Sequence, residues 1–220
     1  MTISKIRPIR SYVLRQGRLT KHQAEGVKSL SPLYAIPFGD NILNWDAIFN
    51  NQGKRIIEIG FGMGHTTAEI AETLSDSNFI AIDVHSPGVG NLLNKIKEKN
   101  LKNLKIIQHD AVEVLEKMTL DESIDAIHIF FPDPWHKKRH NKRRLIQQTF
   151  LELISRKLKK EGYIHIATDW EDYANWIIEI FKNNSMYKAK NIDFSKKPSY
   201  RPKTKYENRG VSLGHQVWDM

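Results

Sequence analysis

Apolar and polar residues alternate along the chain in two rhythms from residue 54 onward. Short apolar runs rich in β-branched residues are separated by segments in which apolar residues recur every three or four positions. This alternation predicts parallel strands covered by helices on both faces. The runs are RIIEIG (55–60), FIAIDV (79–84), LKIIQHD (104–110), IDAIHIFF (124–131) and YIHIAT (163–168). The helical segments are 66–74, 90–99, 111–118, 141–160 and about 172–182.

Two further apolar stretches lie near the end of the sequence, MYKAKNI (186–192) and GHQVWDM (214–220). A long polar loop joins them, and no helix fits between them. They therefore predict an antiparallel pair at one edge of the sheet. The whole pattern predicts an α/β fold of the Rossmann-like type, with seven strands that are mostly parallel.

The first thirty residues hold seven Lys or Arg against one acid, Glu25, and show no clean helical or strand period. We interpret residues 1–30 as a basic, mobile arm. Residues 31–50 are expected to pack onto the domain, so that 31–220 form a single domain.

The composition narrows the class of partner. A net charge of +9 and a pI near 9.6 indicate a polyanion, although a charged surface that keeps the protein in solution gives the same numbers. No apolar stretch approaches the roughly 18 residues of a membrane-spanning helix. The absence of cysteine excludes disulfides and thiolate metal sites and suits a reducing, cytoplasmic setting.

Five predicted strands carry an acid at or near the carboxyl end. Ligands of open parallel sheets bind outside these strand ends, so the row predicts a site along one edge. An Asp between a strand and a helix is often only an N-cap, and Asp110 and Asp169 fit that alternative. The five acids are Glu58, Asp83, Asp110, Asp133 and Asp169.

The first strand leads into E-x-G-x-G-x-G, with Gly60, Gly62 and Gly64. A dinucleotide fingerprint would have its third glycine at position 65, which is His65, and the G-K-[ST] of a P-loop is also absent. An acid without a phosphate-binding cation suits a cofactor with an ammonium and a sulfonium. Asp83 is placed to accept hydrogen bonds from ribose hydroxyls.

Pro132-Asp133-Pro134-Trp135 ends the fourth run, and six Lys or Arg follow in 137–144. This patch is expected to meet a nucleic acid, whereas Lys157, Lys159 and Lys160 fit the solvated face of a helix. Trp135 is either a stacking platform for a base or a plug at the sheet edge. A metal at His136 and His140 is disfavoured by the surrounding cations.

These stretches resemble known enzymes. The glycine turn with Asp83 resembles the class I S-adenosylmethionine-dependent methyltransferases. FFPDPWHKKRHNKRR (130–144) is similar to the signature of the bacterial tRNA (guanine-N7)-methyltransferases, as are ATDW (167–170) and TKYE (204–207). The resemblance covers roughly residues 30 to 220. It implies methyl transfer from S-adenosyl-L-methionine to N7 of a variable-loop guanine, guanine 46, in tRNA. The family usually has Glu where this chain has Asp83.

The resemblance also implies roles for individual residues, with no metal and with a monomer or homodimer. Asp133 would be catalytic. The cofactor would contact Glu58, Gly60, Gly62, Gly64, Asp83, Asp110 and Asp133. The substrate would contact Lys137, Asp169, Thr204, Lys205, Tyr206 and Glu207. RNA would contact Arg139, His140, Asn141, Lys142, Arg143 and Arg144.

Two other classes of function remain to be compared with the enzyme. One is a non-catalytic RNA-binding module on a Rossmann-like scaffold, because a fold does not fix a function. The other is a nicotinamide-dependent reductase, which His65 disfavours. A scaffold has no use for Glu58 and Asp83 at cofactor positions or for an acid between prolines, so the sequence favours the methyltransferase.

Overall fold

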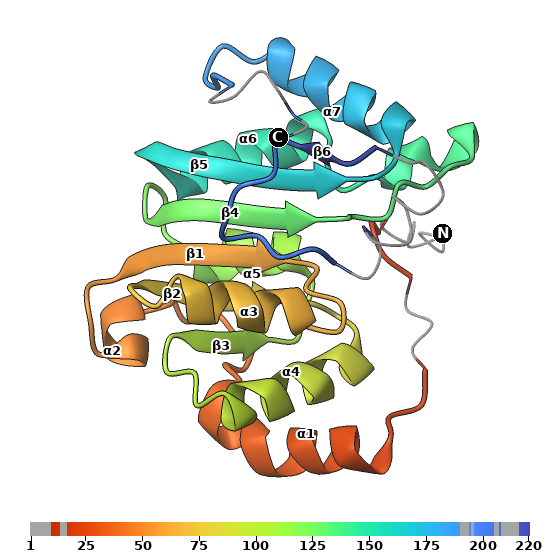
Figure 1. The fold of residues 1–220 in the computed structure, drawn as a ribbon. Coiled ribbons are helices and arrows are strands. Elements are labelled where there is room, and N and C mark those ends of the chain that lie inside the picture. Colours follow the sequence, from red (N-terminus) through yellow and green to blue (C-terminus); the bar gives the residue numbers. More distant parts are fainter. Residues whose placement is uncertain (1–9, 14–16, 190–193, 195, 205–206, 208–215) are drawn as a thin grey trace, which may run out of the picture.

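The computed structural model describes residues 10–13, 17–189, 194, 196–204, 207 and 216–220. In this part of the chain six strands form one sheet in the order β3-β2-β1-β4-β5-β6 (Figure 1). The strands are β1 (Lys54–Ile59), β2 (Ser77–Ile82), β3 (Leu104–Ile107), β4 (Ile124–Phe130), β5 (Leu158–Thr168) and β6 (Trp218–Asp219).

The first five strands are parallel, and β6 pairs antiparallel with β5. Every residue of β2 is buried, as expected for a parallel strand covered on both faces. The mostly parallel α/β sheet with an antiparallel C-terminal edge is therefore confirmed. The order reverses between β1 and β4, which is the switch point where ligands bind in such sheets.

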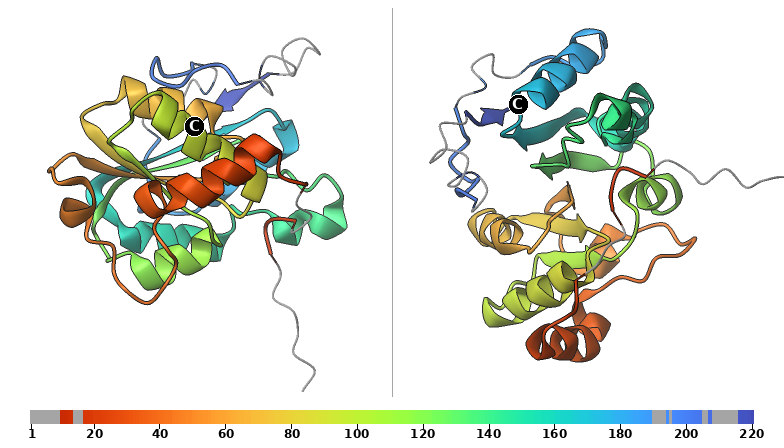
Figure 2. Two further views of the ribbon diagram at one scale, coloured as in Figure 1. Left: turned by 90° about the horizontal axis from the view of Figure 1, so that it is seen from below. Right: turned by 90° about the vertical axis from the view of Figure 1, so that its right-hand side faces the viewer.

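Helices pack on both faces of the sheet, and the two layers enclose separate apolar cores (Figure 2). Helices α1, α3 and α4 contribute to one core, and α2, α5, α6 and α7 to the other. Four of the helices confirm the predicted segments, although α4 starts four residues earlier than expected. The helices are α1 (Lys21–Tyr34), α2 (Trp45–Phe49), α3 (His65–Thr73), α4 (Ser86–Glu98), α5 (Ala111–Met118), α6 (Gln148–Lys157) and α7 (Glu171–Lys182).

Helix α1 begins within residues 1–30, for which the sequence indicated no regular period, and continues to Tyr34. Thr20 and Gln23 form a capping box at its start. Its contact with α4 is made through a glycine, because a Cβ at Gly26 would lie 2.5 Å from the Asn94 side chain. Leu30 is the other buried residue of the helix, and a single buried apolar side chain gives no apolar period. Residue 30, where the domain was expected to begin, lies inside this helix.

The helix predicted over 141–160 is wrong in its first and last parts. Residues Lys138–Arg143 form a 3₁₀ turn, η1, and α6 begins only at Gln148. The backbone of Arg144 is extended, because its guanidinium donates to Pro134 O and to Asp172 and so holds the chain against α7. Residues 158–160 belong to β5.

The strand predicted over 186–192, the seventh strand of the expected sheet, is also wrong where its residues are described. Residues 186–189 form no strand, and 190–192 lie outside the described residues. The Tyr187 hydroxyl bonds to Ser155 Oγ at 2.6 Å and its ring packs on Phe181, which draws this stretch onto the helix layer. GHQVWDM contributes only β6, which pairs with β5 instead. No helix in the described part of the chain is long and apolar enough to cross a membrane.

Candidate active site

The five predicted acids all lie at or just beyond the carboxyl ends of the parallel strands, on the same side of the sheet. Glu58 is in β1, and the other four directly follow or lie within three residues of the ends of β2 to β5. Asp110 is the N-cap of α5, since its carboxylate accepts from Val112 N at 2.9 Å. Asp169 is not a cap, because Trp170 precedes α7 and no side chain caps that helix.

The glycine turn between β1 and α3 is built from three residues in the left-handed region. Gly60, Gly62 and Gly64 have φ of 78°, 56° and 70°, which side chains with a Cβ adopt only with strain. A Cβ at Gly60 or Gly62 would meet no protein atom within 4 Å. These two glycines are therefore required by backbone conformation, and the space beside them is open to a ligand.

Glu58 is a buried carboxylate beside this turn, with 2% of its surface exposed. Oε1 accepts from Thr67 Oγ1 at 2.8 Å, and Oε2 has no hydrogen-bond partner among the described residues. Burial raises the pKa of Glu58 to about 7, the Thr67 bond opposes this, and the nearby Asp83 charge adds to it. A cationic group of a ligand would supply the hydrogen-bond donor and the positive charge that this carboxylate lacks.

Asp83 stabilises the glycine turn through hydrogen bonds to the backbone. Its carboxylate accepts from Gly62 N at 2.7 Å and from His85 N at 2.9 Å. Burial raises the pKa of Asp83, while these backbone bonds act in the other direction. The shorter side chain at this position therefore holds the turn directly, in addition to the ribose contact that the resemblance implies.

Asp133 stands in a turn with unusual backbone geometry. Phe131 and Trp135 have φ of 52° and 47°, although neither is glycine, and the two prolines lie between them. Such conformations persist only where the surrounding structure enforces them, and they cluster at functional sites. The Asp133 side chain remains accessible. Desolvation raises its pKa, Arg143 and His136 lower it, and Asp83 raises it further.

The basic run divides into two groups that the sequence alone does not distinguish. Arg143 stacks on Trp135 at 3.8 Å and donates to the backbone oxygens of Arg10 and Tyr12. Arg144 is buried, with its guanidinium on Pro134 O and Asp172. Both therefore hold the turn in shape. The side chains exposed to solvent are Lys137, Lys138, Arg139 and Lys142.

The aromatic and polar neighbours of this run also have structural contacts. Trp135 Nε1 donates to Ser11 O at 3.0 Å and its ring is covered by Arg143, which favours the plug over the stacking platform. His140 contacts the edge of Trp135, and Asn141 O accepts from Gln147. No group of three or more His, Asp or Glu suited to a metal occurs among the described residues.

Residues 10–12 contribute to this site, although no sequence pattern predicted it. A cavity of about 230 Å³ lies beside Asp110, and Arg10, Tyr12 and Val84 are among its lining residues. Burial and then Asp110, by its charge and a hydrogen bond, raise the pKa of Tyr12. This short segment therefore covers the strand ends of β2 and β3.

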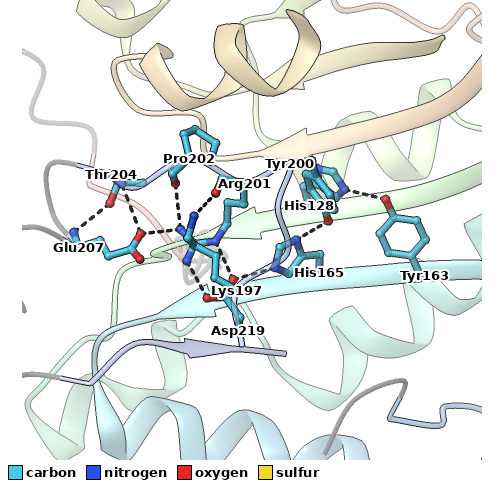
Figure 3. A network of polar contacts seen from close by, with 10 residues as sticks. All are labelled: His128, Tyr163, His165, Lys197, Tyr200, Arg201, Pro202, Thr204, Glu207 and Asp219. Carbon is cyan, nitrogen blue, oxygen red and sulfur yellow. Dashed lines mark hydrogen bonds and ion pairs between the residues drawn. The ribbon is translucent and has the colours of Figure 1, made fainter. Parts of the chain in front are cut away.

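The expected substrate loop is partly described. Thr204 and Glu207 are both buried and bond to each other, since Glu207 N donates to Thr204 Oγ1 at 2.9 Å and Thr204 N to Glu207 Oε2 at 3.3 Å. The Glu207 carboxylate also accepts from Arg201 at 2.8 Å (Figure 3). Lys205 and Tyr206 lie outside the described residues, so their predicted roles stay predictions.

The strand order, the open glycine turn after β1 and the acids along one edge define a Rossmann-like methyltransferase of class I. A family model described as "Putative methyltransferase" matches residues 52–220. Three curated relatives carry the name tRNA (guanine-N(7)-)-methyltransferase. That of Methylobacillus flagellatus is 52% identical over 97% of this chain and 90% of its own length. That of Nitrosospira multiformis is 48% identical over 97% of this chain and 93% of its own length. That of Chromobacterium violaceum is 50% identical over 97% of this chain and 95% of its own length. The chain belongs to the tRNA (guanine-N7)-methyltransferase family.

Proposed function

We propose that the protein transfers a methyl group from S-adenosyl-L-methionine to N7 of guanine 46 in the variable loop of tRNA, giving N7-methylguanine. The observation that carries this proposal is the placement of Asp133. It is accessible at the strand edge that holds the glycine turn and the unpaired Glu58 oxygen, and exposed cations follow it within nine residues. The family of the chain supports the same activity.

The residues at the edge fit this cofactor. Glu58 and Asp83 would hold its cationic and ribose groups, and Gly60 and Gly62 leave room for its approach. When bound, the cofactor supplies a methyl group on an electrophilic sulfonium. Asp110, beside the cavity under Tyr12, is available to a further hydrogen-bond donor.

Asp133 would act on the guanine. N7 carries a free lone pair, so no base is needed to activate it, and positioning supplies much of the acceleration. Methylation makes the base cationic and its N1–H more acidic. A carboxylate at the Watson–Crick edge accepts from N1–H and binds more strongly as that charge develops, which lowers the barrier.

The test is methylation of tRNA that lacks the modification, with methyl-labelled cofactor. We expect label in tRNA at a site where the chain becomes cleavable by aniline after reduction, which identifies both base and atom. Cleavage at the variable-loop guanine would support guanine 46. Binding of tRNA without transfer of label would instead favour the RNA-binding module.

The unusual pKa of Glu58 predicts a pH dependence of cofactor affinity. Glu58 is protonated below its pKa of about 7 and ionised above it, so affinity for a cationic ligand rises with pH. Between pH 5.5 and 7 the ionised fraction grows on the order of tenfold, while an α-amino group of pKa about 8 stays charged. We expect the dissociation constant of S-adenosylhomocysteine, measured by calorimetry, to fall by about that factor.

Glu58→Gln is the matched variant, because glutamine keeps an acceptor for Thr67 and cannot ionise. Its affinity at pH 7 should be lower than that of the parent and nearly independent of pH in this range. The same pH dependence in both proteins would exclude Glu58 as its source.

Gly88, in the first turn of α4, predicts a steric effect on the glycine turn. A Cβ at Gly88 would lie 1.8 Å from Gly62 O, so Gly88→Ala must displace the turn or the helix. Such overpacking typically costs about 1 to 3 kcal/mol, and we expect affinity for S-adenosylhomocysteine to fall by roughly 10-fold or more. Gly39→Ala is the control, since its Cβ would meet nothing within 4 Å. Equal affinities of the two variants would contradict the prediction.

A further inference from the structure

A buried polar network joins β4, β5 and β6 to Tyr200, Arg201 and Glu207 (Figure 3). Its centre is Arg201, none of whose surface is exposed. Nε and Nη2 of Arg201 donate to the two oxygens of Asp219, both at 2.6 Å, and Nη1 donates to Glu207 Oε2 at 2.8 Å. One guanidinium therefore ties strand β6 to the loop that contains Thr204 and Glu207.

Arg201 also contacts the strand that leads to Asp133. Its guanidinium carbon lies 5.9 Å from the centre of the Phe130 ring and 5.7 Å from that of Phe131. Phe131 is separated from Asp133 by a single residue. The side chain of Arg201 thus lies between the end of β4, from which the Asp133 turn departs, and the carboxylate of Glu207.

The rest of the network links the strands through histidine and tyrosine side chains. A carboxylate only accepts, so His165 Nε2 donates to Asp219 Oδ1 at 2.9 Å. His165 Nδ1 lies 2.6 Å from the Tyr200 hydroxyl, and His128 Nε2 lies 3.2 Å from the Tyr163 hydroxyl. Burial lowers the pKa of His128 to about 3, so its ring is neutral, and its Nδ1 has no hydrogen-bond partner among the described residues.

The electrostatics of Arg201 favour a fixed geometry. Burial opposes its charge, but the bonds to Asp219 and Glu207 outweigh this and raise its pKa. Buried ion pairs are weak evidence for stability, because apolar residues of similar volume often stabilise a fold as well. A planar guanidinium does, however, fix two carboxylates relative to each other through its rigid fork of donors.

We propose that Arg201 is a positioning residue for methyl transfer, holding the Glu207 carboxylate, and Thr204 bonded to it, in place relative to the Asp133 turn while Asp219 anchors Arg201 to β6. This inference rests on the proposed function. Arg201 acts through Glu207 and does not touch the substrate itself. Because misplacement of a substrate group by about 1 Å can cost 100-fold in rate, loss of the fork should reduce turnover more than binding.

Arg201→Lys tests the role, because lysine keeps the charge and cannot bridge both carboxylates in one plane. We expect kcat per cofactor-binding site to fall by about 10- to 100-fold. The KM for tRNA and the dissociation constant of S-adenosylhomocysteine should stay within about threefold. Lys157→Met is the matched control. Lys157 is a buried cation paired with Asp121 at the amino ends of β4 and β5, away from the carboxyl ends that carry the acids. Its loss should therefore lower the melting temperature and leave kcat per site unchanged.

A double-mutant cycle separates positioning from a general structural role. If Arg201 acts through Glu207, Arg201→Lys with Glu207→Gln should lose about as much kcat as the more damaging single variant, well short of the product of the two losses. Should Arg201→Lys leave no cofactor-binding protein, Asp219→Asn gives the same comparison, since it weakens the anchor and keeps the Arg201–Glu207 pair.

A parental kcat per site in Arg201→Lys, or multiplicative losses in the cycle, would overturn the proposal. Parent protein that transfers no methyl to tRNA would instead refute the proposed function, and the two failures are therefore distinguishable.

Discussion

Asp133→Asn is expected to lower kcat by about 100-fold or more, the scale of losing one group that stabilises developing charge. Asparagine keeps the size of the side chain and the backbone of the turn between Phe131 and Trp135. It loses the charge that would bind the methylated guanine more strongly than the unmodified one. Folding and tRNA affinity should stay close to those of the parent, because Asp133 is accessible and its turn is held by other residues.

Single-turnover rates with saturating cofactor and tRNA measure this effect directly. Asp76→Asn is the matched control, since Asp76 is exposed and directly precedes β2, at the amino ends of the parallel strands and away from Asp133. Asp133→Glu should also be slow, because the longer side chain shifts the carboxylate. A parental rate in Asp133→Asn would mean that the two prolines and Asp133 serve only the shape of the turn.

The second large effect is expected from the exposed cations of the basic run. Replacing Lys138, Arg139 and Lys142 together by Ala should weaken tRNA binding by on the order of 100-fold near 0.15 M salt. Each lost phosphate contact reduces the slope of log affinity against log salt by roughly 0.7 to 0.9, so the triple variant should lose about 2 to 3 units. Phosphate contacts position the RNA and do not select the base, so kcat at saturation should change little.

A control of equal charge is available on the same protein. Lys97, Lys102 and Lys160 are exposed and lie outside the run, so their triple replacement by Ala changes the net charge by the same amount. It should leave most of the salt slope intact. Equal slopes in the two triple variants would show that tRNA responds to total charge and not to this surface. Arg143 and Arg144 are unsuitable for the test, because their replacement would also collapse the turn.

The strands and the row of acids could be predicted because both follow from local pattern. Apolar runs of four to eight residues must lie in the sheet, and parallel strands bring their carboxyl ends to one edge. The uses of Arg143 and Arg144 could not be predicted in this way, since charge in a sequence does not report burial. Helix α1 was also not predicted, because its two buried residues are Gly26 and Leu30, and a single buried apolar side chain gives no helical period.

The Arg201 network was missed because its members are spread from residue 128 to residue 219. One signal was nevertheless present. His128 and His165 each interrupt an apolar run, and they are paired in register on β4 and β5. Two polar side chains facing each other inside a sheet must find partners, and those partners had to come from another segment.

The long sequence separation of these contacts has a consequence for synthesis and folding. Ser11 and Trp135 are 124 positions apart, and His165 and Asp219 are 54 apart. Contacts of high sequence separation are slow to form, because much of the chain must be ordered before they close. A nascent chain translated only through Asp169, the residue after β5, contains the glycine turn and every strand-end acid, yet it lacks Arg201, Glu207 and Asp219. We therefore expect cofactor binding to be acquired during translation before the part of the site that we propose to bind guanine is complete.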